Sequence, residues 1–257
     1  AICGITRIRS PETNKDEHMN TVKIEKQNTR LIAHRGVSGI ERENTAAAFV
    51  AAGNRGYYGI ETDVHVTKDG KYIIIHDDDT KRVFGTEYSV EGSDFDLLRS
   101  LRLTDKNGDE RGDLCLPTLD EFLGICRTYD KIGVLELKNA MKKAQIKEIY
   151  ETAKKKYDLT KMIFISFCYE NLAVLRSLDA KIRLQFLTGE EVNDTLIGKL
   201  KKYGLGLDIY FEKLTAENVK FLKQNGVEVN CWTVDDKSAA ERLISYGVDY
   251  ITTDILE

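Results

Sequence analysis

One stretch indicates both the fold and the chemistry of this chain: Gly59-Ile60-Glu61-Thr62-Asp63-Val64-His65-Val66. Side chains of a β-strand point alternately to opposite faces. One face of this strand therefore carries mostly aliphatic side chains together with Thr62, and the other carries Glu61, Asp63 and His65. If the aliphatic face packs under helices, the ionisable face points into the centre of a barrel. Carboxylates would repel one another there, and a divalent cation would offset their charge.

Similar short runs rich in β-branched residues recur along the chain and alternate with amphipathic stretches. The runs are 31–34, 59–66, 72–76, 132–138, 162–166, 182–187, 205–209, 227–233 and 249–253. This alternation predicts an α/β fold with a mostly parallel sheet covered by helices. A TIM-type (β/α)8 barrel needs one strand fewer than these candidates. Lys68-Asp69-Gly70 reads as a tight turn rather than a crossover helix, so one candidate is expected to be arranged differently.

The domain organisation expected from the sequence is simple. Residues 1–28 are polar and aperiodic, which predicts a flexible N-terminal arm. Residues 29–257 are expected to form a single barrel domain, with a less regular insertion at about 78–118 between early strands. A length of 257 residues suits one such barrel.

Composition excludes several classes of partner. The net charge of −4 arises from acidic and basic residues mixed throughout, so no basic face is offered to a nucleic acid. No apolar run approaches the length of a membrane span, which argues against stable membrane insertion. The five cysteines are widely spaced without a C-x-x-C pair and read as free thiols of a reducing compartment. We therefore expect a cytoplasmic protein; the oligomeric state is left open.

A second strand adds to the ionisable face. In Gly133-Val134-Leu135-Glu136-Leu137-Lys138 the same alternation places Glu136 and Lys138 on the inner side. The carboxylates alone could be members of structural salt bridges. His34 and His76, however, follow strands at their carboxyl ends, where barrel active sites lie. Two imidazoles near a metal can act as general base and general acid.

These motifs, in order, resemble the glycerophosphodiester phosphodiesterase family. The likeness rests on His34-Arg35-Gly36, Glu43-Asn44-Thr45, Glu61-Thr62-Asp63, Lys68-Asp69-Gly70 and His76-Asp77, followed by Glu136-Leu137-Lys138, Ser166-Phe167, Trp232-Thr233-Val234 and Thr253-Asp254. It covers about residues 31 to 254. One departure is Arg42, where the family commonly has proline.

The resemblance implies a site and a reaction. Glu61, Asp63 and Glu136 would hold one divalent cation, Mg²⁺ or Ca²⁺, and His34 and His76 would be the acid–base pair, in either order. Substrate-binding residues would be Arg35 and Lys138, which neutralise the phosphodiester. The expected reaction is hydrolysis of a small-molecule glycerophosphodiester to glycerol 3-phosphate and an alcohol.

Several alternatives stay open at this point. Trp232 could be barrel packing, but its place at a strand end leads us to expect a substrate-binding residue, a wall against which glycerol rests. His65 is either a further metal ligand or, as we prefer, a satisfied polar neighbour. Related barrels of the lysophospholipase D or phosphatidylinositol-specific phospholipase C type share the two-histidine chemistry. A non-catalytic barrel that binds phosphoesters is the rival from another class. The alcohol head group is not indicated.

Overall fold

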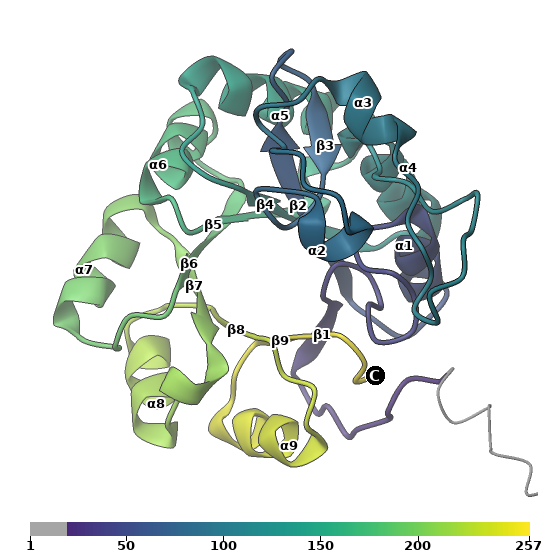
Figure 1. Cartoon of the computed structure of the whole chain (residues 1–257). Helices are drawn as coiled ribbons and strands as arrows, with labels where there is room; N and C mark the ends of the chain where they lie inside the picture. The colour runs from purple at the N-terminus through teal and green to yellow at the C-terminus, as the bar shows by residue number, and fades with distance from the viewer. Residues whose placement is uncertain (1–19) are drawn as a thin grey trace, which may run out of the picture.

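The structure, a computed structural model, describes residues 20–257 as a TIM barrel (Figure 1). Eight parallel strands form the barrel and helices surround it. The barrel strands are β1 (Arg30–Ala33), β2 (Gly59–Val66), β4 (Ile132–Leu137), β5 (Met162–Ser166), β6 (Arg183–Thr188), β7 (Gly206–Tyr210), β8 (Val229–Trp232) and β9 (Tyr250–Thr253). The predicted fold class is confirmed.

The sheet closes because β1 pairs with both β2 and β9. The ninth strand, β3 (Tyr72–Ile74), lies outside the barrel and runs antiparallel to β2. The turn between β2 and β3 contains Gly70 with a φ of +77°, in the left-handed region that glycine enters at little cost. The ninth candidate strand of the sequence is thus one arm of a hairpin.

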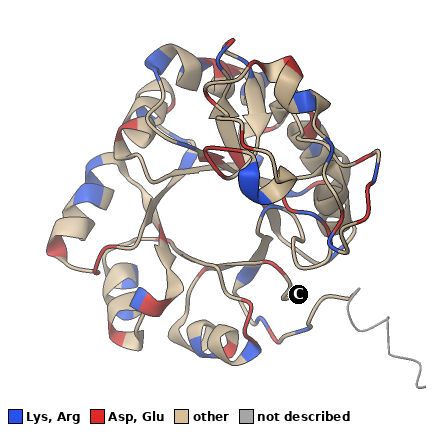
Figure 2. Cartoon of the chain, viewed as in Figure 1, with Lys and Arg blue, Asp and Glu red and all other residues tan. Residues whose placement is uncertain are grey.

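Helices cover the outside of the barrel and separate its strands. They are α1 (Ala46–Gly53), α4 (Leu119–Tyr129), α5 (Lys143–Lys156), α6 (Tyr169–Leu178), α7 (Asp194–Tyr203), α8 (Ala216–Gln224) and α9 (Lys237–Tyr246), with short 3-10 turns η2 (Leu159–Lys161) and η3 (Phe211–Lys213). Local sequence fixes their starts: Thr118 and Glu121 form a reciprocal capping box on α4. Aliphatic and aromatic side chains between strands and helices form the main core, and charged residues are spread over the outer ring (Figure 2).

The amino end of the barrel is filled by a network of charged and aromatic side chains. Tyr250 accepts hydrogen bonds from Arg183 and from Arg30 and donates one of 2.6 Å to Glu228. The guanidinium of Arg30 also lies 4.9 Å from the ring centre of Tyr58. These groups occupy the interior of the barrel at its amino end.

The segment between β3 and α4 packs around a small core of its own. It contains α2 (Lys81–Phe84) and α3 (Phe95–Ser100). Its buried residues are Ile73, Ile75, Val83, Val90, Leu98, Leu103, Leu114 and Leu116. This segment lies over one side of the barrel mouth in Figure 1, and it supplies Asp77 and Arg82 to the site described below.

Part of the predicted N-terminal arm falls within the described residues. Val22 pairs with Leu256, and Ile24 donates a backbone hydrogen bond of 2.9 Å to Glu257. Lys23 lies 2.8 Å from the Glu257 carboxylate. Residues 20–28 therefore contact the C-terminal segment, while residues 1–19 lie outside the described part of the chain.

Candidate active site

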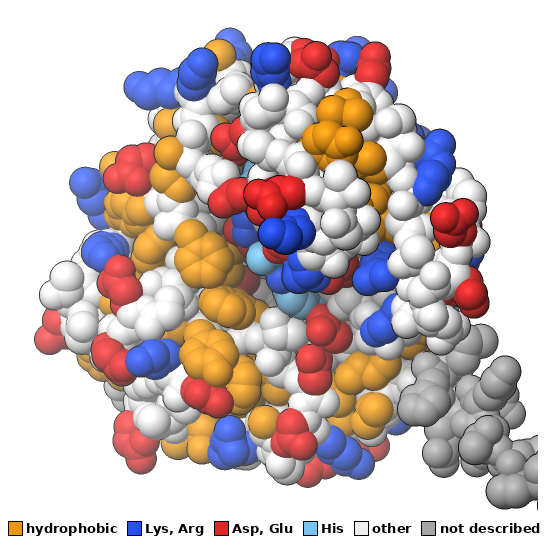
Figure 3. Space-filling view, in the orientation of Figure 1, with side chains coloured by type: hydrophobic (Ala, Val, Ile, Leu, Met, Phe, Trp, Pro, Cys, Tyr) orange, Lys and Arg blue, Asp and Glu red, His pale blue; other side chains and the backbone are white. Residues whose placement is uncertain are grey.

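The candidate site is a pocket at the carboxyl ends of the barrel strands. It encloses a cavity of about 100 Å³ lined on one side by His34, Arg35, Glu61, His76 and Glu136, and on the other by Ile165, Phe167, Leu187, Asp208, Trp232, Thr233 and Thr252. Figure 3 shows histidine side chains inside this hollow, with hydrophobic side chains on one flank and charged ones on the other. The pocket therefore joins a polar half to a largely apolar half.

Three buried carboxylates form the base of the polar half. Glu61 and Asp63 come from the inner face of β2, and Glu136 comes from the neighbouring β4, directly opposite Asp63 in register. One oxygen from each lies within 4.8 Å of the others. This spacing lets a single cation contact all three carboxylates, and hard oxygen ligands are those that Mg²⁺ and Ca²⁺ prefer.

The three carboxylates cannot all be ionised at neutral pH without compensation. Burial, then the charges of Asp63 and Glu136, raise the pKa of Glu61 well above its usual value. Burial and Asp63 likewise raise the pKa of Glu136 to about 8. Burial would also raise the pKa of Asp63, but Lys138 and the other cations outweigh it and lower that pKa. The negative charge of the cluster is thus concentrated on Asp63, and proton binding relieves the repulsion where no cation does.

Two cationic side chains face this cluster. The Lys138 ammonium lies 2.9 Å from Glu136 and 3.6 Å from Asp63. Arg35 donates to Glu43 through Nη1 at 2.8 Å, while its Nε lies 3.8 Å from Asp63 and is buried without a hydrogen-bond partner. Burial opposes the charge of both cations, but the surrounding carboxylates raise the pKa of each. Both stay charged and are placed to meet an anion in the pocket.

The loop after β1 holds Arg35 and His34 in place by its backbone. Arg35 has a φ of +54°, and its N–H donates to the Glu61 carboxylate at 2.8 Å. Gly36 follows with a φ of +78°, and a Cβ atom there would lie 2.6 Å from the backbone of Ala48 on α1. Only glycine fits this close approach of loop and helix. Asn44, at the end of the loop, donates to Asp63 at 2.8 Å and orients that carboxylate.

His34 is anchored through one ring nitrogen. Its Nδ1 lies 2.7 Å from Asp254, which also accepts a 2.8 Å hydrogen bond from Ser38. Burial would raise the pKa of Asp254, yet these hydrogen bonds outweigh it and lower that pKa. An ionised Asp254 accepts a hydrogen bond from the protonated Nδ1 of His34. The other ring nitrogen, Nε2, lies 4.0 Å from Glu61 and faces the pocket.

His76 is anchored in the same manner. Its Nδ1 lies 2.6 Å from Asp77, whose other oxygen accepts from Arg82 at 2.6 Å. Arg82 also donates two 2.7 Å hydrogen bonds to Glu43, the partner of Arg35. Burial lowers the pKa of His76, and nearby Asp63 partly opposes that effect. A pKa below the usual histidine value keeps this imidazole largely neutral at pH 7.

Aromatic side chains form the apolar flank. Trp232 at the end of β8 packs edge-on against Phe167, with ring centres 5.7 Å apart, and against Tyr210 at the same distance. Phe167 is 51% exposed and stands at the rim. The predicted position of Trp232 beside the site is therefore observed, although it also packs against its barrel neighbours.

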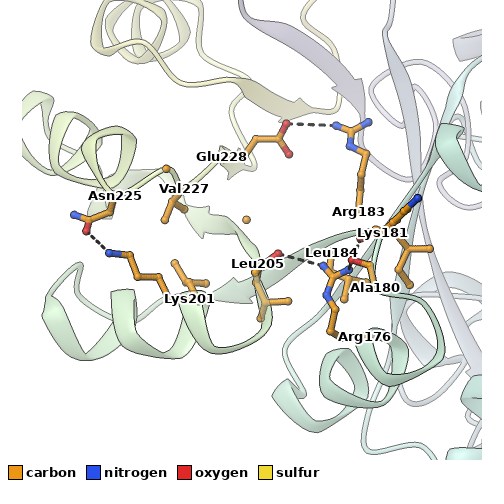
Figure 4. A pocket seen from close by; sticks show the side chains of 15 residues that line it. Arg176, Ala180, Lys181, Arg183, Leu184, Lys201, Leu205, Asn225, Val227 and Glu228 are labelled. Atoms are coloured by element: carbon orange, nitrogen blue, oxygen red, sulfur yellow. Dashed lines mark hydrogen bonds and ion pairs between the residues drawn. The ribbon is translucent and has the colours of Figure 1, made fainter.

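A larger hollow of about 440 Å³ lies at the opposite end, around the starts of β6, β7 and β8 (Figure 4). Two of its cations already have hydrogen-bond partners: Arg176 donates to the carbonyls of Tyr203, Ala180 and Ile182, and Lys201 donates to Asn225. This hollow contains no histidine or carboxylate cluster among its described lining residues. The candidate active site is therefore the pocket at the carboxyl end.

The structure brings all the predicted site residues together around one pocket, namely His34, His76, Arg35, Lys138, Trp232, Glu61, Asp63 and Glu136. His65 points away from the cluster, 3.3 Å from Glu91 and from the His76 carbonyl, as a buried polar neighbour. Sequence reasoning assigned no role to Asp77 and Asp254. The sequence signal for Asp77 was its position directly after the strand-end histidine, and that for Asp254 was its position directly after the last strand.

Comparison with known proteins identifies the family. Residues 34–257 match the Glycerophosphoryl diester phosphodiesterase family. The chain belongs to this family. A glycerophosphodiester phosphodiesterase of Caldanaerobacter subterraneus subsp. tengcongensis is 32% identical over 88% of this chain and 94% of its own length. The family resemblance predicted from the sequence is confirmed, and the chain is an enzyme of the phosphodiesterase class.

Solved structures of the family agree with this fold. A phosphodiesterase from Oleispira antarctica, in complex with the product sn-glycerol-3-phosphate, has a TM-score of 0.80 and 26% identity over 88% of this chain and 92% of its own. A glycerophosphodiester phosphodiesterase from Parabacteroides distasonis has a TM-score of 0.75 and 30% identity over 90% and 94%. No helix in the described part of this phosphodiesterase is long and apolar enough to cross a membrane.

Proposed function

We propose that this phosphodiesterase hydrolyses glycerophosphodiesters to glycerol 3-phosphate and an alcohol, with a divalent cation and the two histidines His34 and His76. The observation that carries the proposal is the meeting of three carboxylates, two cations and two carboxylate-anchored imidazoles in one pocket. The Oleispira relative, with sn-glycerol-3-phosphate bound, supports a glyceryl phosphate as the product.

The residues present fit a divalent cation. Glu61, Asp63 and Glu136 are buried and offer three oxygens within 4.8 Å of one another. The two neighbouring cations do not fully compensate their negative charge, since the pKa values of Glu61 and Glu136 remain raised. A bound Mg²⁺ or Ca²⁺ would supply Lewis-acid polarisation of the phosphoryl oxygens. Asn44 would hold Asp63 in the ligating orientation through its 2.8 Å hydrogen bond.

Arg35 and Lys138 bind and neutralise the phosphodiester. Both are charged and largely buried, so their attraction for the phosphate is little screened by water. Their attraction for the phosphoryl oxygens becomes stronger as negative charge grows on these oxygens in the transition state. The hydrogen bond from Arg35 to Glu43, itself held by Arg82, keeps the guanidinium in a fixed place.

The two imidazoles share the proton transfers. In each, Nδ1 is committed to a carboxylate, Asp254 for His34 and Asp77 for His76, so Nε2 is the atom that exchanges protons. One Nε2 accepts the proton of the attacking oxygen, and the other gives a proton to the departing alkoxide. The geometry gives each histidine the same type of anchor, so the order of roles is left open.

Product analysis tests this proposal. The purified enzyme is incubated with glycerophosphocholine, glycerophosphoethanolamine, glycerophosphoinositol and lysophosphatidylcholine, with and without a chelator. We expect glycerol 3-phosphate from the deacylated diesters and no turnover after chelation. Full activity in the chelator contradicts the metal assignment, and release of lysophosphatidic acid alone favours the lysophospholipase D alternative.

A further inference from the structure

One buried acid in the active-site pocket has no role in the mechanism above. Asp208 lies in the middle of β7, flanked by Leu207 and Ile209, and only 2% of its surface is exposed. No hydrogen bond to its carboxyl group exists among the described residues, and its Oδ1 is buried without a partner. Buried polar groups are almost always hydrogen-bonded in native proteins, so this exception requires an explanation.

The neighbouring polar side chains inside the barrel do not share this property. Asn230 donates to Gln185, Gln185 donates to Glu228, and Thr252 donates to Asn230. These side chains hydrogen-bond one another, and two of them, Gln185 on β6 and Asn230 on β8, lie on the strands that flank Asp208. The unpaired acid is therefore a feature of one position and not of the barrel interior in general.

Asp208 borders the catalytic cavity. It lines the cavity together with Leu187, which is its register partner on β6, and with Trp232, whose indole donates to the Asp208 carbonyl at 3.4 Å. The opposite wall carries His34 and Arg35. A phosphodiester held by the cations would therefore extend one of its ester groups toward Asp208, Leu187 and Trp232.

The surroundings of Asp208 determine what it can bind. Burial, and secondarily the charge of Glu136, raises the pKa of Asp208 well above its usual value. The neutral carboxylic acid offers one O–H donor and a carbonyl acceptor. An alcohol hydroxyl also donates and accepts one hydrogen bond each, whereas an ammonium group would require the ionised form in an apolar setting.

We propose that Asp208 is a substrate-binding residue that hydrogen-bonds a hydroxyl of the glyceryl group and so makes the enzyme selective for glyceryl esters. This inference rests on the proposed function. The glyceryl chain combines carbon atoms, which suit Leu187 and Trp232, with a hydroxyl, which suits Asp208. Without substrate the orphan carboxyl only lowers stability, because an unsatisfied buried polar group is unfavourable.

The test compares two substrates and three variants. Glycerophosphocholine carries both glyceryl hydroxyls, and propylphosphocholine lacks them. The variants are Asp208→Leu, which removes the polar group, Asp208→Asn, which keeps a neutral donor and acceptor, and Gln185→Leu, a matched polar-to-leucine change outside the cavity lining. The measured quantity is the ratio of kcat/KM for the two substrates, together with the thermal midpoint.

We expect the wild type to prefer glycerophosphocholine by ~10-fold or more, since an unpaired hydrogen-bonding group opposes binding of the analogue. Asp208→Leu should reduce this preference to within about 3-fold of unity, mainly through KM, while Asp208→Asn keeps most of it. Asp208→Leu should also raise the thermal midpoint, whereas Gln185→Leu should lower it and keep the preference.

A preference that is unchanged in Asp208→Leu, or lost equally in Asp208→Asn, overturns the inference while leaving the hydrolytic function in place. Failure of the wild type to release glycerol 3-phosphate from glycerophosphocholine or any other glycerophosphodiester overturns the proposed function and this inference with it. A wild type that hydrolyses both substrates equally well contradicts the inference alone.

Discussion

The clustered carboxylates predict that, in the absence of divalent cations, this phosphodiesterase becomes more stable when one of them is neutralised. The perturbation is Glu136→Gln. The pKa of Glu136 rises to about 8 in the folded protein, from an ordinary value of 4.5. Between these values the folded protein holds a proton that the unfolded chain has lost, so the free energy of unfolding falls as the pH rises. Glutamine has no such proton and removes this dependence.

The magnitude follows from the shift in this pKa. A pH of 7 is about 2.5 units above the pKa of Glu136 in the unfolded chain. At about 1.4 kcal/mol per unit, the wild type has therefore lost about 3 kcal/mol of unfolding free energy at this pH. For comparison, two unit charges 4.8 Å apart, the upper limit of the carboxylate spacing, repel by about 3.5 kcal/mol at an effective dielectric constant of about 20. We therefore expect Glu136→Gln to gain about 3 kcal/mol at pH 7 and almost nothing near the unfolded pKa.

Urea unfolding followed by circular dichroism measures this difference, in a chelator, near pH 5 and near pH 7. Glu151→Gln, on the exposed face of α5, is the matched control and should leave the unfolding free energy unchanged. With excess Mg²⁺ or Ca²⁺ the wild type should become more stable than Glu136→Gln, because the cation binds to the intact set of three carboxylates. A variant no more stable than the wild type at pH 7 in the chelator would refute the reasoning.

Three further predictions concern the loops around the site. His34→Ala and His76→Ala should each lower kcat by ~10²–10⁴-fold in the product assay while the thermal midpoint stays near that of the wild type; substantial kcat in either variant contradicts its role in proton transfer. Asp77→Asn removes the hydrogen bond that raises the pKa of His76, so the limb of the kcat–pH profile controlled by His76 should move to lower pH. Gly36→Ala should lower the free energy of unfolding by at least about 1 kcal/mol, because the φ of +78° disfavours a side chain and Ala48 leaves no space for it; an unfolding midpoint equal to that of the wild type argues against this steric account.

Period-two alternation predicted the inner positions of the three carboxylates correctly, because side chains of a strand alternate between its two faces. Glu61, Asp63 and Glu136 all lie where the alternation placed them. The pairing of β3 could not be obtained in this way, since periodicity indicates which face a residue occupies but not which strand is its neighbour. The turn at Gly70 was the only local sign that β3 forms a hairpin with β2.

The anchors of the histidines show where sequence reasoning ends. Asp77 is adjacent to His76 in the chain, whereas Asp254 lies 220 positions from His34 and meets it only because β9 pairs with β1. The closure of the barrel therefore creates the His34 anchor, and no local pattern contains it. Asp208 differs again: a lone acid between leucine and isoleucine is visible in the sequence, but its lack of a partner is a property of the packed interior.

Several unfavourable local features of this enzyme lie at the carboxyl end of the barrel. Arg35, Asn44 and Asn139 adopt positive φ angles beside the site, the carboxylate cluster has shifted pKa values, and Asp208 lacks a partner. The repulsion within the carboxylate cluster and the unpaired carboxyl group of Asp208 lower the stability of the unliganded protein, and a cation or a hydroxyl in the pocket would compensate them. Ligands that fill the pocket should therefore raise the stability of the fold, whereas the amino-end network of Tyr250 and Arg183 has its hydrogen bonds without any ligand.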